Sequence, residues 1–265
     1  MQQNILIVIP ARYNSSRLPG KPLLMIAGKT MLQRVCETAQ LAAKQFGGKI
    51  LVATDDDRIL QHAQQLGVDA LLTDPACSTG TDRVISAINL LPVKPSIIIN
   101  LQGDTPLTPV TVITELLNTI LNLNTSCIAT PVVQLTWNEL DSLRNTKINN
   151  PFSGTTVIMN NKQEAIWFSK QIIPGIRNES QLRNTQQLSP IYQHLGIYAY
   201  TLDMLETFAA LPLGNYEQLE GLEQLRLLEN SFKIQAVPVK LPNLNAWRGV
   251  DTLDDAKLVA QLLGE

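Results

Sequence analysis

The sequence predicts an α/β protein with a mixed, mostly parallel sheet flanked by helices and an antiparallel insertion near its middle. Up to residue 109, short runs rich in isoleucine, valine and leucine alternate with stretches whose apolar residues recur at helical spacing. This alternation is typical of a doubly wound parallel sheet. Beyond residue 109 strand-like runs follow one another, which predicts antiparallel pairing. We expect a single domain over residues 1–265, with the insertion at about 126–200.

The regular alternation defines the elements of the amino-terminal half. Residues 5–9 form a β-branched-rich run closed by Pro10, which suits a strand buried on both faces of a sheet. After a loop over 11–22, apolar positions at helical spacing predict a helix over 31–46. The same reasoning predicts strands at 49–53, 70–72 and 96–101, and helices at 81–91 and at 56–66, which ends at Gly67.

The carboxy-terminal half is less regular. Residues 178–189 are polar and lack any period, so we expect a mobile surface loop. Residues 218–230 are strongly amphipathic and predict one helix whose leucines face the core, namely Leu219, Leu222, Leu225 and Leu228. The other predicted elements are helices at 110–121, 202–209 and 252–263, and strands at 126–133, 155–159, 165–168, 194–200 and 233–239.

The composition excludes several classes of protein. The chain has 21 Lys+Arg against 23 Asp+Glu, a formal net charge of −2. Nucleic-acid and acidic-membrane binders need a basic surface, so neither partner is expected. Three cysteines without a C-x-x-C spacing and two isolated histidines give no disulfide framework or zinc site. No apolar run approaches the roughly 18 residues of a membrane span, and we expect a cytoplasmic protein.

The first loop contains three cations, Arg12, Arg17 and Lys21, directly after the first predicted strand. Open α/β sheets bind ligands at this edge, and Arg and Lys bind phosphate oxygens, so we expect a polyphosphate site. A solvated basic loop is the alternative. The loop is neither a Walker A sequence nor a G-x-G-x-x-G fingerprint.

Two aspartates are candidate Mg²⁺ ligands because one directly follows a predicted strand and the other directly precedes a predicted helix. Asp104 ends the segment Asn-Leu-Gln-Gly-Asp after a buried strand, and a carboxylate beside a triphosphate most simply holds Mg²⁺. Asp251 precedes the last predicted helix, 147 positions further along. Either aspartate could instead be a helix N-cap. The two share a metal only if the fold brings them together.

Seven segments, in this order and spacing, resemble the 3-deoxy-manno-octulosonate (Kdo) cytidylyltransferase family, the CMP-Kdo synthetases of lipopolysaccharide synthesis. They are PARYNSSRLPGKPL, VATDDDRI, STGTDRV, NLQGDTP, HLGIYAY, LEQLRLL and GVDTLDDA, and the similarity runs from about residue 5 to residue 262. The first is typical of cytidylyltransferases for acidic sugars, while HLGIYAY, LEQLR and GVDT indicate the Kdo branch. The resemblance implies a nucleotide-diphospho-sugar transferase fold, a homodimer, and Mg²⁺-dependent conversion of CTP and Kdo, a 2-keto-3-deoxy sugar acid, to CMP-Kdo and pyrophosphate.

The resemblance also implies residue roles. The catalytic and triphosphate-holding residues would be Arg12, Arg17, Lys21 and Asp104, and the metal ligands Asp104 and Asp251. The substrate-binding residues would be Thr79, Gly80, Arg83, Gln102, His194, Tyr198, Glu220, Glu223 and Gln224. The acceptor hydroxyl must attack the α-phosphorus in line with departing pyrophosphate, so positioning and charge neutralisation suffice and no protein nucleophile is needed.

Several positions leave the identity of the acceptor substrate undetermined. His194 begins an apolar run and could be a core histidine. Thr105 and Thr156 stand where the family usually has Glu and Lys, and residues 245–248 also depart from its pattern. The nucleotide end is intact, so the alternatives are an amino-Kdo variant or a small phosphonate as acceptor. A catalytically silent nucleotide-binding protein is a third, against which the retained cations and aspartates argue.

Overall fold

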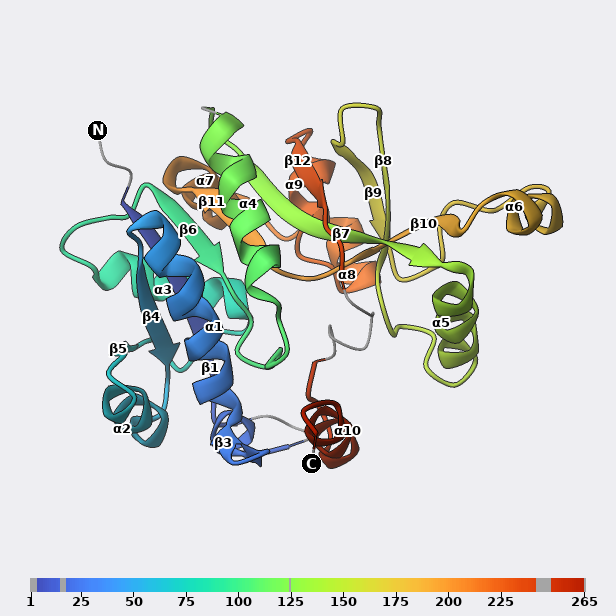
Figure 1. The fold of residues 1–265 in the computed structure, drawn as a ribbon. Helices are drawn as coiled ribbons and strands as arrows, with labels where there is room; N and C mark the ends of the chain where they lie inside the picture. The colour runs from blue at the N-terminus through green and yellow to red at the C-terminus, as the bar shows by residue number, and fades with distance from the viewer. Residues whose placement is uncertain (1–3, 15–17, 124, 242–248, 265) are drawn as a thin grey trace.

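A ten-stranded mixed sheet with helices on both faces forms the centre of the protein (Figure 1). The computed structural model describes residues 4–14, 18–123, 125–241 and 249–264. Within them, β1 (Ile5–Ala11) pairs in parallel with β4 (Lys49–Thr54) and β6 (Ile97–Asn100), and β4 pairs in parallel with β5 (Asp69–Leu72). The predicted parallel half of the sheet is confirmed.

Strand β1 is buried along its whole length. Its odd-numbered side chains belong to a core cluster with α1 (Met31–Phe46) and α4 (Val110–Leu123), while Leu6 and Val8 pack in a second cluster with α3 (Gly80–Leu90) and α7 (Leu202–Ala210). Successive side chains of a strand point to opposite faces, so one β-branched run serves two layers of helices. The strand continues through Pro10 to Ala11, two residues further than predicted.

The second half of the sheet is largely antiparallel. Its strands are β7 (Ile128–Thr136), β8 (Thr156–Met159), β9 (Ala165–Ser169), β10 (Leu188–His194), β11 (Tyr198–Thr201) and β12 (Ile234–Pro238). The order across the sheet is β5-β4-β1-β6-β11-β7-β10-β8-β9, and β12 pairs in parallel with β7. Strand β11 therefore joins the two halves, because it lies antiparallel to both β6 and β7.

The single strand predicted over 194–200 is wrong. The chain forms the end of β10 and the start of β11, separated by Gly196 at φ +65°. Glycine adopts this left-handed conformation without strain, which lets the chain leave one strand position and enter another.

The mobile loop predicted over 178–189 is also wrong. This segment contains α6 (Glu179–Thr185) and the beginning of β10, and α5 (Trp137–Asn149), which the pattern did not predict, lies beside it. Arg144 and Arg183 each make ion pairs to both Asp141 and Glu179, and the pairs Arg144–Glu179 and Arg183–Asp141 join the two helices. These charged contacts replace the apolar stripe by which a helix is recognised in a sequence.

The helix predicted over 218–230 is two short helices, α8 (Asn215–Glu220) and α9 (Leu225–Glu229). Gly221, at φ +63°, ends α8 and turns the chain. As a result Leu219 is 68% exposed, whereas Leu222 and Leu225 are buried as expected. The apolar spacing continues across Gly221, whose positive φ changes the direction of the chain.

The carboxy-terminal helix α10 (Leu253–Leu262) packs beside the first loop. It forms a small cluster with the turn that contains η1 (Lys21–Leu23), β2 (Met25–Ile26) and β3 (Lys29–Thr30). This packing places the residues before α10 next to the end of β1. The remaining helix, α2 (Asp57–Gln65), ends before Gly67 as predicted. No helix in the described ranges is long and apolar enough to cross a membrane.

Candidate active site

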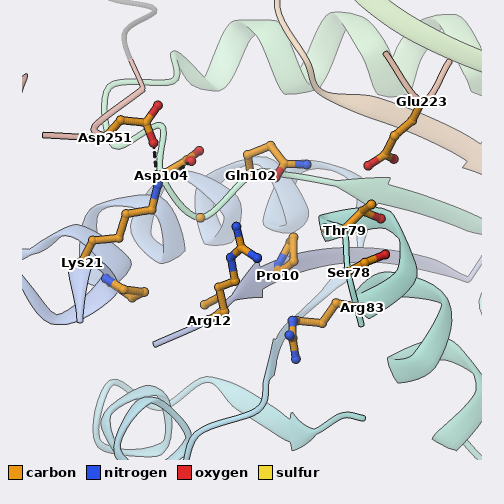
Figure 2. Close-up of a pocket in the computed structure, with 14 residues that line it drawn as sticks. Pro10, Arg12, Lys21, Ser78, Thr79, Arg83, Gln102, Asp104, Glu223 and Asp251 are labelled. Carbon is orange, nitrogen blue, oxygen red and sulfur yellow. Dashed lines mark hydrogen bonds and ion pairs between the residues drawn. The ribbon is translucent and has the colours of Figure 1, made fainter. Parts of the chain in front are cut away.

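A cleft of about 420 Å³ opens at the carboxyl ends of β1 and β6 (Figure 2). Its wall combines the end of β1, the start of α3, the loop after β6, and single residues from the carboxy-terminal third of the chain. The lining residues are Pro10, Ala11, Arg12, Lys21, Pro22, Ser78, Thr79, Gly80, Arg83, Gln102, Gly103, Asp104, Glu223 and Asp251. The edge of the sheet predicted to bind a ligand therefore carries a polar cavity.

Lys21 joins the two aspartates at one end of the cleft. Its Nζ donates to Asp104 Oδ2 at 2.8 Å, to Asp251 Oδ1 at 3.1 Å and to the carbonyl of Val250 at 3.2 Å. Burial alone would lower the pKa of Lys21, but the charges and hydrogen bonds of both aspartates outweigh burial and raise it. Lys21 thus stays an ammonium ion, and it is the residue that brings the two carboxylates together.

Backbone contacts support the same arrangement. The amide of Val250 donates to the carbonyl of Asp104 at 2.9 Å, which ties the segment before α10 to the loop after β6. Neither aspartate is a helix N-cap: Thr252 caps α10 through a reciprocal pair with Asp255, and α4 begins six residues after Asp104. The capping interpretation is therefore wrong for both aspartates, and their carboxylates face the cleft (Figure 2).

The structure describes two of the three cations of the first loop, Arg12 and Lys21. Arg12 is exposed, lines the cleft and has no hydrogen-bond partner among the described residues, and Figure 2 shows its guanidinium between Lys21 and Pro10. Arg17 lies outside the described residues. The loop returns toward Lys21 through Gly20, at φ +72°, whose amide donates to the carbonyl of Tyr13 at 2.8 Å.

Two glycines allow the walls of the cleft to approach closely. A Cβ on Gly103 would lie 2.7 Å from the carbonyl oxygen of Pro10, and one on Gly80 would lie 3.0 Å from Oε1 of Gln102. The first contact is shorter than real Cβ contacts and involves backbone, which cannot rotate away. Gly103 therefore sets the spacing between the ends of β1 and β6.

Arg83, predicted to help hold the substrates, is anchored in the wall. Its guanidinium donates to Asp55 Oδ2 at 2.9 Å and to Thr73 Oγ1 at 2.7 Å, and the residue is 2% exposed. Asp55, directly after β4, is a site residue that the sequence reasoning missed, although VATDDDRI was recognised as a motif. Its position after a buried parallel strand is the signal that could have identified it.

Thr79 and Glu223 lie at the end of the cleft that is farther from Lys21 (Figure 2). Thr79 is the N-cap of α3 and forms a capping box with Asp82. Burial raises the pKa of Glu223, and hydrogen bonds to Thr81 and Thr79 offset part of that rise. The end of the cleft away from the aspartates therefore presents a carboxyl group that is more easily protonated than usual.

The other predicted acceptor residues lie behind this end. His194 is buried, with Nε2 2.8 Å from Thr130 Oγ1 and its ring against Phe168 and Tyr198. Burial lowers the pKa of His194 to about 3, so the ring is neutral. Neither His194 nor Tyr198 lines the cleft, and this packing supports the core interpretation of His194.

Glu220 and Gln224 flank the same region. Glu220 accepts hydrogen bonds from Ser169 Oγ at 2.8 Å and from the amide of Lys170 at 2.7 Å, so it ties α8 to the end of β9. Gln224 is 4% exposed, and its Nε2 has no hydrogen-bond partner in the described part of the chain. Glu220 thus has a structural partner, whereas Gln224 has an unused donor.

Thr105 and Thr156, two positions that depart from the family pattern, make hydrogen bonds to nearby backbone carbonyls. Thr105 donates to the carbonyl of Gln102 at 3.1 Å. Thr156 donates to the carbonyl of Gln171 at 2.7 Å and accepts from the amide of Ile173 at 3.0 Å. Residues 245–248, the third departure, lie outside the described residues. Both threonine hydroxyls therefore have hydrogen-bond partners within the chain.

Comparison with known proteins places these features in a family. A family model described as cytidylyltransferase matches residues 6–234. The 3-deoxy-manno-octulosonate cytidylyltransferase of Maricaulis maris is 40% identical over 98% of this chain and 97% of its own. The 8-amino-3,8-dideoxy-manno-octulosonate cytidylyltransferase of Shewanella woodyi is 42% identical over 88% and 89%.

A solved structure agrees with these relatives. The structure of a CMP:2-keto-3-deoxy-manno-octonic acid synthetase complexed with CTP superimposes with a TM-score of 0.84 at 36% identity, and the match covers 98% of both chains. Sequence, fold and the residues of the cleft lead to the same assignment. This chain belongs to the cytidylyltransferase family of CTP-dependent nucleotidyltransferases.

Proposed function

We propose that this protein transfers CMP from CTP to the anomeric hydroxyl of Kdo and releases pyrophosphate, in the cytoplasm, for lipopolysaccharide synthesis. The observation that carries the proposal is the convergence of Asp104, Asp251 and Lys21 in one cleft with Arg12. The similarity of nearly the whole chain to Kdo cytidylyltransferases supports the choice of acceptor.

Mg²⁺ is the proposed cofactor, and the two aspartates fit it. Their oxygens contact the same nitrogen atom, so they surround one position that suits a cation. Mg²⁺ commonly uses one or two carboxylates together with substrate phosphates, and the pair of Asp104 and Asp251 fits that requirement. When bound, the ion would neutralise phosphate charge and acidify the attacking hydroxyl.

The protein residues would act by position and charge. Arg12 and Lys21, with Arg17 from the same loop, neutralise the triphosphate, while Thr79, Gly80, Gln102 and the anchored Arg83 form the wall that orients the substrates. The acceptor oxygen forms a bond to the α-phosphorus as the bond to pyrophosphate breaks. Such a transfer depends on alignment and electrostatic stabilisation, which the cations and carboxylates of the cleft would supply together with Mg²⁺.

We also propose a homodimer. Apolar side chains are exposed on the edge strand β9 and the adjacent α8, where the Trp167 and Tyr216 rings meet at 5.2 Å. Ile166 is 54% exposed, Tyr216 50% and Leu219 68%. Sedimentation velocity should show a dimer for the wild type and a monomer for Leu219→Glu, because contiguous exposed apolar patches mark interaction sites. A monomeric wild type would contradict the proposal.

Pyrophosphate release from CTP tests the reaction. The wild type should release pyrophosphate with Kdo and Mg²⁺, and a panel with 8-amino-3,8-dideoxy-Kdo and a small phosphonate determines the preferred acceptor. The amino sugar is the second candidate because relatives with that activity are equally similar to this chain. Rapid use of another acid with negligible use of Kdo would refute the first choice, and no release with any acceptor would support a silent protein.

A further inference from the structure

Tyr13 connects the two sides of the first loop. It directly follows Arg12, and its backbone carbonyl accepts a hydrogen bond at 2.8 Å from the amide of Gly20, which directly precedes Lys21. A Cβ on Gly20 would lie 3.1 Å from Cε2, Cζ and Oη of Tyr13, so the hydroxyl end of the ring packs closely against the glycine. The backbone and the ring of Tyr13 therefore join the segment after one cation of the cleft to the segment before another.

Helix α2 supports the Tyr13 ring from outside the loop. The guanidinium carbon of Arg58, in the first turn of α2, lies 3.3 Å from the centroid of the ring. Arg58 is held in turn by Asp56, the N-cap of α2, through bonds of 2.9 Å from Nε to Oδ1 and 2.6 Å from Nη2 to Oδ2. The Tyr13 ring also packs against the core cluster that contains β1 and α1. Three separate contacts thus fix the position of this ring.

Neither Tyr13 nor Arg58 lines the cleft, whereas Arg12 and Lys21 do. Figure 2 shows the side chains of these two cations inside the cleft. Arg12 is exposed and has no hydrogen-bond partner among the described residues, so its position depends on the backbone that carries it. A contact that fixes this backbone reduces the conformational entropy lost when the cations bind an anion.

We propose that Tyr13 is a positioning residue for the polyphosphate of the nucleotide: its ring, held by Gly20 and Arg58, fixes the backbone from which Arg12 and Lys21 enter the cleft. The proposal rests on the proposed function, in which these cations neutralise the triphosphate. Its consequence is specific. Loss of the ring should weaken binding of the β- and γ-phosphates, and should leave binding of the rest of the nucleotide nearly unchanged.

Calorimetric titration with CTP, CDP and CMP, in Mg²⁺ and without acceptor, tests the proposal. Tyr13→Ala should bind CTP about tenfold more weakly, because one hydrogen bond to a charged group corresponds to about that factor. CMP lacks the β- and γ-phosphates, so its affinity should stay within about twofold of the wild-type value. Tyr13→Phe keeps the ring and should retain most of the affinity for CTP.

Two further variants separate the ring contact from a general effect of charge. Arg58→Met should weaken CTP binding by about two- to fivefold, which is the contribution of an exposed cation–π contact. Lys44→Met removes one positive charge from the exposed side of α1 and is the matched control, which should bind CTP like the wild type. In steady-state kinetics Tyr13→Ala should raise KM for CTP and leave KM for Kdo unchanged.

The melting curve shows whether Tyr13→Ala is folded. If it is not, Tyr13→Leu takes its place, because leucine keeps an apolar side chain against the core without a planar ring. Unchanged affinity for CTP in the folded variant would overturn the proposal, and so would equal weakening of CTP, CDP and CMP, which indicates a general structural role. A wild type that does not bind CTP refutes the proposed function and this proposal with it. A wild type that binds CTP no more tightly than Tyr13→Ala refutes this proposal alone.

Discussion

Replacing Lys21 by Met should destabilise the protein in a way that Mg²⁺ reverses. The ammonium of Lys21 is the cation that Asp104 and Asp251 share, at 2.8 and 3.1 Å. Methionine keeps the apolar stem and removes the charge, so the two carboxylates would lose the cation that they share. If the two aspartates hold Mg²⁺ as proposed, the ion would supply positive charge at the same oxygens in place of the lost ammonium.

The expected loss follows from burial and contact geometry. Each hydrogen bond to a charged group contributes about 1.5–3 kcal/mol, but solvent screens the interaction because the aspartate side chains are 33% and 38% exposed. We expect about 2 kcal/mol in total, which lowers the melting temperature of a chain of this size by about 4–8 °C. Burial alone would lower the pKa of Lys21, but the two aspartates outweigh burial and raise the pKa above its ordinary value. The stabilisation is therefore fully present at neutral pH and is lost only as pH rises through the raised folded-state pKa.

Thermal unfolding at pH 7.5, with EDTA and with millimolar Mg²⁺, measures the effect. Lys21→Met should melt lower than the wild type in EDTA and gain more from Mg²⁺ than the wild type does. The control is Lys29→Met, which removes a surface ion pair to Glu37 and should change stability by less than about 1 kcal/mol. If Lys21→Met melts like the wild type in EDTA, or Mg²⁺ stabilises both equally, the reasoning is refuted.

Three further predictions concern the cleft and the core. Asp104→Asn and Asp251→Asn should each remove most Mg²⁺-dependent turnover with the fold intact by circular dichroism; near-normal turnover in either would exclude that residue as a metal ligand. Gly103→Ala should cost about 1–3 kcal/mol in urea unfolding and raise KM for CTP, since its Cβ would lie 2.7 Å from the Pro10 carbonyl; an unchanged urea midpoint would show that the walls can separate freely. Because the folded-state pKa of His194 is about 3, below the 6.5 of an unperturbed imidazole, the unfolded chain binds a proton between these values and stability should fall by about 2 kcal/mol from pH 8 to pH 5. His194→Gln should flatten this part of the stability profile, and a profile as steep as that of the wild type would assign the acid sensitivity to other groups.

Much of the fold could be predicted because the spacing of apolar residues along the chain indicates each strand or helix. The β-branched run of β1 indicates a strand with helices on both faces, and the spacing of apolar residues in α1 predicted its bounds correctly. The seven family segments likewise follow from the order of residues. Where local chemistry and local pattern conflict, the prediction failed: α6 is held by ion pairs to α5, and Gly221 divides an apparently continuous helix.

Candidate site residues could be named from the sequence, but only the tertiary structure decided which of them lie together. Asp104 and Asp251 are 147 positions apart, and no periodicity encodes that α10 packs against the first loop or that Lys21 contacts both carboxylates. The same is true of the Asp55 contact with Arg83. Local sequence determines which face of an element is apolar, whereas the order of strands across the sheet determines which polar ends meet.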